Sequence, residues 1–388
     1  MKSKDIIEED KKYIAGTYAR FPVAFKEGKG SRLYDYDGRE YVDCGSGIAV
    51  NIFGVNDEEW KNAVIAQMNS IQHASNLYYT KPQADLARLL CERTGAKKVF
   101  FGNSGAEANE CAIKAARKYG EIKHGADRKQ IITLKESFHG RTLATLAATG
   151  QDAFHKYYGP FPEGFVYADP TIEGVEACMN ERTCAVMIEC IQGESGVNVL
   201  DKNFVQAVEK LCRERDIIFI CDEVQTGNGR TGRLYAYQAY GVSPDIVTTA
   251  KGLGGGLPIG ACMLFEKCAG VFGHGDHGST FGGNPVVCAG AYSILSRIDE
   301  KLLVSVREKG EYFREGLKKI DGVKEVTGMG LMIGIHTDKP AAEVANECMK
   351  RGLLVLTAHS NVRLLPPLTI SKDDIDFALK ILNEVISQ

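Results

Sequence analysis

The sequence contains no apolar run long enough to cross a membrane and no block of basic residues. A membrane-spanning helix needs about 18 or more consecutive apolar residues. The 47 Lys+Arg and 50 Asp+Glu give a net charge of −3, which lacks the basic excess typical of nucleic-acid or anionic-membrane binding. The first residues, MKSKDIIEEDKKY, are charged where a secretory signal is apolar. These absences predict a cytoplasmic protein whose partners are small molecules rather than nucleic acid or membrane.

Signals for disulfides and for metal sites are also missing. Twelve cysteines are scattered through apolar stretches and no C-x-x-C occurs, which predicts buried free thiols. His274 and His277 form an H-x-x-H pattern in the glycine-rich stretch HGDHGST, but no third ligand is suggested nearby. A loop role is therefore favoured over a metal site, and we predict no bound metal.

Proline is sparse, with 11 residues, whereas glycine reaches 42, so the glycine excess does not indicate a disordered linker. Between about 60 and 290, helical stretches alternate with short apolar stretches that run into polar or glycine-rich loops, as in KKVFFGNSGAEANE, AVMIECIQGE and DIIFICDEVQTG. This alternation predicts an α/β fold with a mostly parallel sheet. In such sheets ligands bind at the carboxyl ends of the strands, where these loops lie.

The chain length predicts two domains. We expect a large ligand-binding domain over 47–288 and a smaller α+β domain over 289–388, in which 292–320 form one helix. Residues 1–46 contain an alternating apolar pattern around Asp37-Gly38, which predicts a hairpin. That N-terminal segment is expected to pack with the small domain.

A literal G-x-G-x-x-G occurs at Gly227, Gly229 and Gly232, directly after an apolar stretch. Taken alone, it indicates a dinucleotide site and a nicotinamide-dependent oxidoreductase. However, Asp222 and Glu223 precede the loop where a pyrophosphate would lie, and no helix start follows it. The dinucleotide interpretation is therefore the weaker one.

Three other features suggest different chemistry. The loop GNSG leads into a helix whose free N–H groups favour an anion, although a simple helix cap explains it equally well. Lys251 ends an apolar stretch beside a glycine run, and a desolvated lysine can form a Schiff base with a carbonyl. Asp222 is a carboxylate at a buried strand end that needs a cationic partner, such as a protonated pyridine nitrogen. Together these are the parts that pyridoxal 5′-phosphate requires.

The motifs GNSGAEANECAIKAARKYG, SFHGRT, IQGESG, CDEVQTGNGRTG, TTAKGLGGGLP, HGSTFGGNP and RLLPPL resemble, in this order, the class III (ornithine-type) aminotransferases. The resemblance covers essentially the whole chain. It implies the aspartate aminotransferase-like fold (fold type I) and pyridoxal 5′-phosphate as cofactor. Within the class, HASNLYYTKPQADLARLL and NVRLLPPLTIS most resemble acetylornithine aminotransferases.

That closer resemblance implies transfer of the δ-amino group of N2-acetylornithine to 2-oxoglutarate in arginine biosynthesis. Other ω-aminotransferases of the class remain alternatives, with ornithine, succinylornithine, succinyldiaminopimelate or 4-aminobutyrate as donor. The segment GVNDEEW departs from the G-H-x-H-P pattern of the class, and Glu189-Cys190 replaces a common Glu-Pro. Neither departure removes a residue that the resemblance assigns to catalysis.

The resemblance also implies roles for individual residues. Lys251 matches the lysine that forms a Schiff base with the cofactor and moves the proton, and Asp222 matches the acid at the pyridine nitrogen. The implied cofactor contacts further include Ser104, Gly105 and Ala106 at the phosphate, Phe138 stacked on the ring, Gln225 near the ring hydroxyl, and Thr280 from the partner subunit of a homodimer.

For the substrates, the resemblance implies two carboxylate sites. Arg141 binds the carboxylate remote from the reacting amine, and Arg363 binds the α-carboxylate of glutamate. Glu194 neutralises Arg363 when an ω-amine is bound and swings away for glutamate; a permanent ion pair is the alternative. Ser279 is also assigned to the substrate site.

Overall fold

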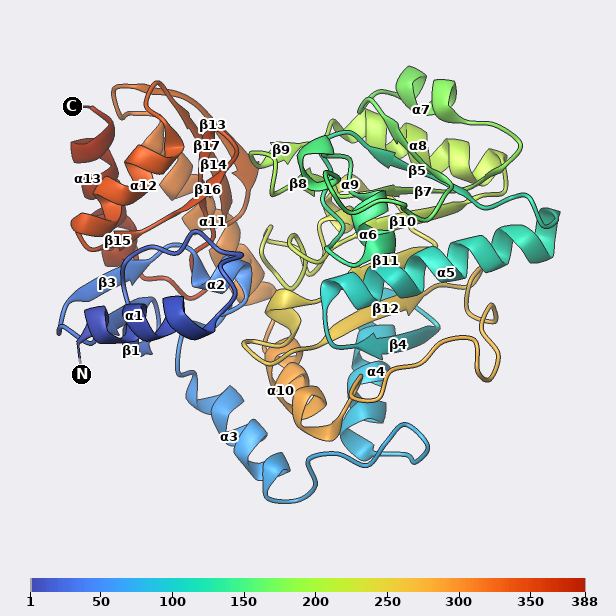
Figure 1. The fold of residues 1–388 in the computed structure, drawn as a ribbon, viewed down its shortest axis with the longest axis horizontal. Helices are drawn as coiled ribbons and strands as arrows, with labels where there is room; N and C mark the ends of the chain where they lie inside the picture. Colours follow the sequence, from blue (N-terminus) through green and yellow to red (C-terminus); the bar gives the residue numbers. More distant parts are fainter. Residues whose placement is uncertain (1, 388) are drawn as a thin grey trace.

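The computed structural model describes residues 2–387. Its centre is a seven-stranded sheet with the order β4-β12-β11-β10-β7-β5-β6 (Figure 1). The strands are β4 (Lys98–Gly102), β5 (Gln130–Leu134), β6 (Phe165–Ala168), β7 (Thr183–Ile188), β10 (Ile218–Asp222), β11 (Ile246–Thr249) and β12 (Gly260–Leu264). All run parallel except β12, which is antiparallel to β11 and β4. The predicted α/β fold with a mostly parallel sheet is confirmed.

Helices cover both faces of this sheet, because its central strands are apolar on both sides. Ile131, Ile218 and Ile246 pack in one cluster with the alanine-rich side of α5 (Gly105–His124). Their neighbours in sequence, such as Phe219 and Val247, pack in another with α8 (Lys202–Glu214). The other helices of this part are α3 (Glu58–Met68), α4 (Lys81–Thr94), α6 (Leu143–Ala148), α7 (Ile172–Cys178), α9 (Tyr237–Tyr240) and α10 (Pro285–Ser296), besides the short pair β8 (Ile191–Gln192) and β9 (Asn198–Val199).

The C-terminal part has an antiparallel sheet of its own, in the order β13-β14-β17-β16. These strands are β13 (Val323–Met329), β14 (Met332–Thr337), β16 (Leu356–Ala358) and β17 (Asn361–Leu364), and the helices packed with them are α11 (Glu300–Leu317), α12 (Ala341–Lys350) and α13 (Lys372–Ile386). The expected helix over 292–320 is thus wrong in one respect. Helix α10 ends at Ser296, and α11 begins as a separate helix. The Asp299 side chain caps the start of α11 by accepting the Leu302 N–H at 2.8 Å.

The N-terminal hairpin lies beside the C-terminal elements (Figure 1). The chain begins with α1 (Ser3–Tyr13), followed by β1 (Phe25–Lys29), β2 (Arg32–Asp35), β3 (Glu40–Asp43) and the short α2 (Ser46–Ala49). The hairpin turn contains Gly38 with φ +82°, which a glycine adopts without strain. β3 pairs in parallel with β15 (Leu353–Leu354), and Arg32 contacts Asp374 of α13 at 2.6 Å.

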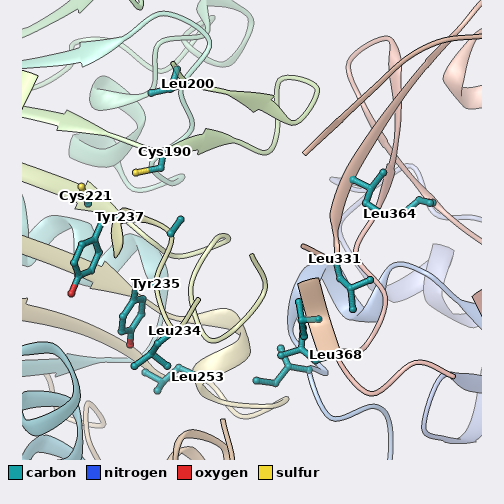
Figure 2. Packing of buried hydrophobic residues seen from close by; sticks show 14 of the residues in the cluster. Cys190, Leu200, Cys221, Leu234, Tyr235, Tyr237, Leu253, Leu331, Leu364 and Leu368 are labelled. Atoms are coloured by element: carbon teal, nitrogen blue, oxygen red, sulfur yellow. The ribbon is translucent and has the colours of Figure 1, made fainter. Parts of the chain in front are cut away.

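One apolar cluster joins the loops of the central sheet to the C-terminal part. It includes Leu234 and Leu253 from those loops and Leu331, Leu364 and Leu368 from the C-terminal part (Figure 2). All twelve cysteines are free thiols and most are buried, as predicted. Among residues 2–387, no helix is long and apolar enough to cross a bilayer.

Candidate active site

A cavity of about 630 Å³ opens where the parallel strands end. Its walls come from the loops after β4, β5, β7, β10 and β11, the arrangement expected for an open α/β sheet. The lining includes the predicted residues Ser104, Gly105, Ala106, Phe138, Arg141, Asp222, Gln225 and Lys251. Sequence positions from 104 to 251 therefore meet in one cavity.

The N-terminus of α5 forms one wall. The Ser104 Oγ caps the helix by accepting the Glu107 N–H at 3.2 Å. The next amides, of Gly105 and Ala106, belong to the first turn, which has no acceptor within the helix. A Cβ at Gly105 would lie 2.7 Å from the Val224 side chain, so only glycine fits there. Free amides at the positive end of a helix suit a phosphate group.

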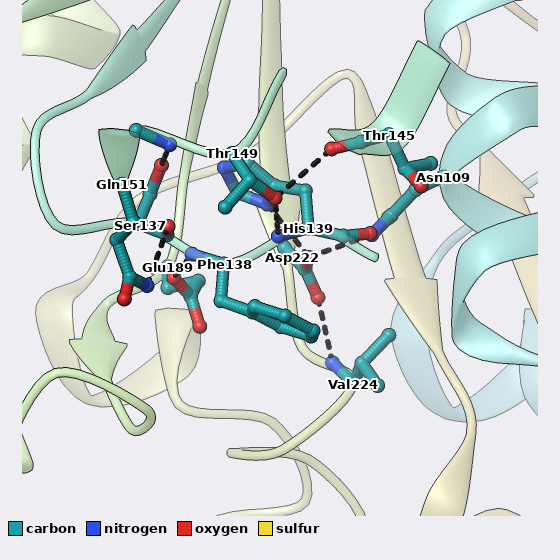
Figure 3. A network of polar contacts seen from close by, with 11 residues as sticks. Asn109, Ser137, Phe138, His139, Thr145, Thr149, Gln151, Glu189, Asp222 and Val224 are labelled. Carbon is teal, nitrogen blue, oxygen red and sulfur yellow. Dashed lines mark hydrogen bonds and ion pairs between the residues drawn. The ribbon is translucent and has the colours of Figure 1, made fainter. Parts of the chain in front are cut away.

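Asp222 is held rigidly at the end of β10 and is only 4% exposed. Its Oδ2 accepts a hydrogen bond from Asn109 Nδ2 at 2.8 Å and lies 2.8 Å from His139 Nδ1, while Oδ1 accepts the Val224 N–H at 3.0 Å (Figure 3). No lysine or arginine forms an ion pair with this carboxylate in residues 2–387. The carboxylate is therefore oriented by neighbours and has room for a cationic ligand group.

Lys251 begins the turn after β11 with φ +45°, a left-handed conformation that is strained for a residue with a side chain. Burial lowers the pKa of its amine, and the charge of Arg363 lowers it further, whereas Glu194 and Asp222 act in the opposite direction. An amine with a lowered pKa is more often neutral and can act as a nucleophile and a base.

Two further carboxylates, those of Glu189 and Glu194, act through their charge to raise the pKa of this amine. Glu189 accepts the Phe138 N–H at 2.9 Å, and burial together with the nearby Asp222 raises the pKa of Glu189 (Figure 3). Burial alone would raise the pKa of Glu194, but its contacts with Arg363 lower that pKa overall. The two glutamates thus differ in their affinity for a proton although both face the same lysine.

Arg363, on β17 of the C-terminal part, is only 3% exposed and lies behind the cavity wall, where it contacts the lining residue Gln225 without lining the cavity itself. Its Nη1 donates to Glu194 Oε1 at 2.8 Å, to the Gly193 carbonyl at 2.9 Å and to Gln225 Oε1 at 3.0 Å. Gln225 Nε2 in turn donates to Glu194 Oε1 at 3.1 Å. Gln225, predicted near a ring hydroxyl, therefore also joins the two ends of this ion pair.

Arg141, unlike Arg363, lines the cavity directly, and it is exposed. Its guanidinium carbon is 4.0 Å from the centre of the Phe154 ring and 5.6 Å from that of Phe138. Stacking on two aromatic rings orients a guanidinium without neutralising it. The site therefore holds one arginine paired with a carboxylate and a second, separate one free to bind an anion.

Ser279 and Thr280 do not line this cavity in their own chain. Ser279 Oγ accepts a hydrogen bond from Asn103 Nδ2 at 3.1 Å, and the Ser279 carbonyl accepts one from Asn76 Nδ2 at 3.0 Å. Thr280 is exposed. The loop that holds Ser279 and Thr280 is thus hydrogen-bonded to Asn103, in the loop between β4 and α5. Thr280 itself is exposed and lies outside the cavity of its own chain.

The G-x-G-x-x-G glycines serve packing instead of a ligand. A Cβ at Gly232 would lie 2.3 Å from the Arg307 side chain, and one at Gly229 would lie 3.0 Å from Leu368. A Cβ at Gly227 would lie 2.8 Å from the Tyr235 ring. The space that a pyrophosphate would need is filled by the protein, so the dinucleotide interpretation is wrong.

Sequence reasoning missed Asn109, His139 and Phe154. The Nε2 of His139 and the Oδ1 of Asn109 are buried without a partner in the described residues. The cavity offers a partner for each part of pyridoxal 5′-phosphate. The amine suits the aldehyde, the buried carboxylate suits the pyridine nitrogen, the aromatic face suits the ring, and the helix N-terminus suits the phosphate. His139 directly follows Phe138 in SFHG, which is the one local signal that could have indicated it.

Comparisons with known proteins agree with this geometry. The family model for class III aminotransferases matches residues 13–386. The chain is 48% identical to the acetylornithine aminotransferase of Haemophilus ducreyi, with all of both chains covered, and 47% identical to that of Caldanaerobacter subterraneus subsp. tengcongensis, with 99% of each covered.

Solved structures give the same result. An ornithine aminotransferase from Toxoplasma gondii superposes with a TM-score of 0.95 at 31% identity, over 100% of this chain and 95% of that one. The N-acetylornithine aminotransferase of Stenotrophomonas maltophilia gives 0.85 at 34%, over 98% of each chain. A second structure of the Toxoplasma enzyme is described with partial occupancy of pyridoxal phosphate at its active site. The resemblance seen in the motifs is confirmed: the chain belongs to the class III aminotransferases and uses pyridoxal 5′-phosphate.

Proposed function

We propose that this enzyme transfers the δ-amino group of N2-acetyl-L-ornithine to 2-oxoglutarate, giving N-acetyl-L-glutamate 5-semialdehyde and L-glutamate, as a step of arginine biosynthesis. The observation that carries the proposal is the pair of separate arginines: Arg363, joined to Glu194, and Arg141, which forms no ion pair with a carboxylate of residues 2–387. The acetylornithine aminotransferases among the relatives support the choice of donor.

The residues of the cavity have distinct roles in this reaction. Ser104, Gly105 and Ala106 would hold the phosphate of the cofactor, Phe138 would stack on its ring, and Asp222 would hold the proton on the ring nitrogen. When bound, pyridoxal 5′-phosphate supplies an aldehyde that accepts the amino group and a ring that withdraws electrons from the amine-bearing carbon. The Lys251 Nζ, with its lowered pKa, would move a proton from the amine-bearing carbon of the donor to the carbon that carried the aldehyde of the cofactor, and would make the reverse transfer to the acceptor carbon in the second half-reaction. The two half-reactions alternate in the same cavity as a ping-pong cycle.

Two substrates with different carboxylate positions must fit this cavity in turn. With N2-acetylornithine, the reacting amine is several carbons from the carboxylate, which Arg141 binds. The Glu194–Arg363 pair stays closed, so that no buried charge lacks a partner. With glutamate, a carboxylate lies next to the reacting amine and takes the place of Glu194 on Arg363. Ser279, which does not line the cavity of its own chain, would belong to the substrate site of a partner subunit in this proposal.

The donor is tested by the steady-state kcat/KM of the enzyme with a panel of amines. We expect N2-acetylornithine to exceed ornithine and 4-aminobutyrate by about 10-fold or more, since a pocket built for an acyl amide discriminates against analogues that leave its polar groups unpaired. Succinylornithine and succinyldiaminopimelate share the acyl amide and serve as matched probes of acyl size. A higher kcat/KM for ornithine or 4-aminobutyrate would assign the enzyme to another ω-aminotransferase activity.

We further propose a homodimer in which Thr280 binds the cofactor phosphate of the partner subunit. Thr280 is exposed and does not line its own cavity. Large exposed apolar side chains lie on the Thr280 loop and on the loop before α4. Phe281 is on the first loop, and Leu77, Tyr78 and Tyr79 are on the second. Asn76 joins the two loops by donating to the Gly282 carbonyl at 2.9 Å. A second copy of the chain would cover this surface and receive Thr280.

A subunit-mixing experiment tests this arrangement. Thr280→Ala should weaken cofactor binding about 10-fold through the lost hydrogen bond to a charged group, and Lys251→Ala should be inactive. In a heterodimer of the two variants, the site with an intact Lys251 receives an intact Thr280 from the partner. We therefore expect the mixture to recover native cofactor affinity at that site. Recovery would be absent if Thr280 served its own subunit.

We propose a large domain over 47–288 and a small domain over 289–388 joined by residues 1–46, with α10 (Pro285–Ser296) spanning the boundary and packing with α3 and α4 of the large domain. The pairing of β3 with β15 and the ion pair between Arg32 and Asp374 support the grouping of the N-terminal segment with the small domain. Because Arg363 lies on the small domain and Lys251 on the large one, the substrate site lies between the two.

A further inference from the structure

The segment GVNDEEW, which departs from the pattern of the class, forms a fixed helix start. The Asp57 side chain caps α3 by accepting the Trp60 N–H at 2.9 Å. Arg297 of the loop after α10 donates to both oxygens of Asp57, at 2.7 and 3.1 Å, and its guanidinium stacks over Phe53. A charge-assisted, two-point contact of this kind holds the first turn of α3 in one orientation. The side chain that this turn presents is Trp60.

Trp60 is the only tryptophan of the chain, and its ring fits against glycines. A Cβ at Gly255 would lie 3.1 Å from the indole nitrogen, and one at Gly290 would lie 3.0 Å from it. A Cβ at Gly256 would contact the far edge of the ring at 3.9 Å. The indole therefore occupies a space that depends on the absence of side chains at Gly255 and Gly290, whereas its contact with Gly256 is an ordinary van der Waals contact. Two of these glycines belong to the run that follows Lys251.

The indole also makes a directed contact with that run. Its Nε1 donates a hydrogen bond to the Gly254 carbonyl at 3.1 Å. Gly254 closes the turn that begins at Lys251, because its N–H donates to the Lys251 carbonyl at 3.0 Å. The left-handed backbone at Lys251 persists only if its surroundings hold it. Trp60 thus fixes the same residue that closes the strained turn.

We propose that Trp60 is a positioning residue for Lys251, which acts through Gly254 to set where the lysine amine enters the cavity. This inference rests on the proposed role of Lys251 in binding the cofactor and moving the proton. It also explains what the GVNDEEW segment does. Asp57 and Arg297 fix the start of α3, α3 presents the indole, and the indole holds the lysine turn.

The test uses the holoenzyme with Trp60→Phe, which keeps an aromatic ring against the glycines and removes the N–H donor. The first readout is the pH midpoint of the visible absorption of the enzyme-bound cofactor, which needs no substrate. We expect this midpoint to shift, because the amine would lie differently relative to Glu194, Arg363, Asp222 and Glu189, the charged groups that face it. We also expect kcat to fall about 5-fold, as for the loss of one hydrogen bond, with KM changed less than about 2-fold.

Val64→Ala is the matched control. Val64 lies one turn further along α3, and its side chain also packs against Gly290 of α10. This variant should lower the melting temperature while leaving the absorption midpoint and kcat unchanged. An unchanged midpoint and kcat in Trp60→Phe would overturn the proposal, and so would an equal midpoint shift in Val64→Ala, because the role of α3 would then be merely structural.

Asp57→Asn provides a second route if Trp60→Phe protein does not accumulate. It keeps a side chain that can cap α3 but weakens the contact with Arg297, and we expect a smaller midpoint shift in the same direction. The absence of any shift would contradict the proposal. Failure of the proposed function gives a different result, since cofactor that borohydride still fixes covalently to Lys251→Ala would show that the lysine is not the residue joined to the cofactor.

Discussion

Replacement of Lys251 by alanine is expected to lower kcat for transamination by about 10³-fold or more, since one change removes both the nucleophile and the proton carrier. No second lysine lines the cavity in the described part of the chain, so no neighbouring amine can take over. Asp222, Glu189 and Glu194 remain, but as carboxylates they cannot form a Schiff base. The loss should therefore appear in both half-reactions equally.

The spectrum of the protein provides the measurement. Wild-type enzyme with added pyridoxal 5′-phosphate should be yellow, and borohydride should bleach it by reducing the bond to Lys251. After borohydride treatment and unfolding, the Lys251→Ala variant should carry no attached cofactor, whereas Lys210→Ala, an exposed change on α8, should keep both the attached cofactor and the rate. A wild-type protein that stays colourless after cofactor addition would contradict the proposed chemistry.

The central sheet was predictable because its signal is local. Uninterrupted apolar stretches such as IIFIC are buried on both faces and end in polar loops, so they indicate parallel strands without any tertiary information. The direction of β12 carries no such signal, because GACML is equally apolar in either orientation. The break at Asp299 is also hidden, since an aspartate inside an amphipathic stretch caps a helix only if the chain turns there.

Residues of the candidate site were predictable where they belong to a recognisable sequence motif. Residues whose role depends on tertiary packing were not. Lys251 stands out beside its glycine run. Asn109 and His139 orient Asp222, but each looks ordinary in sequence, and their contact arises only when α5 and the loop after β5 meet at β10. Trp60 reaches Gly254 across 194 positions, which no local pattern records.

Replacement of Arg363 by alanine should damage the two half-reactions unequally. For glutamate we expect kcat/KM to fall about 10²- to 10³-fold, the usual consequence of removing one partner of a buried charge pair. For N2-acetylornithine, whose carboxylate is proposed to bind Arg141, the loss should stay below about 10-fold. Single-turnover rates followed by cofactor absorbance separate the two half-reactions. Arg363→Lys keeps the charge but loses the two-pronged contact, so it should fall between wild type and Arg363→Ala.

The Arg363→Ala variant leaves Glu194 buried without its partner, and that defect alone could slow both half-reactions. The double variant Arg363→Ala/Glu194→Ala removes this complication and should retain the selective loss with glutamate. Glu194→Ala alone should improve reaction with α-amino donors relative to ω-amines, because Arg363 is then open to an α-carboxylate from the start. An unchanged ratio would indicate a permanent ion pair, and equal losses in both half-reactions of the Arg363→Ala/Glu194→Ala double variant would refute the assignment of the two carboxylate sites. The selectivity of the enzyme therefore depends on whether the contacts of Glu194 with Arg363 and Gln225 open during each cycle.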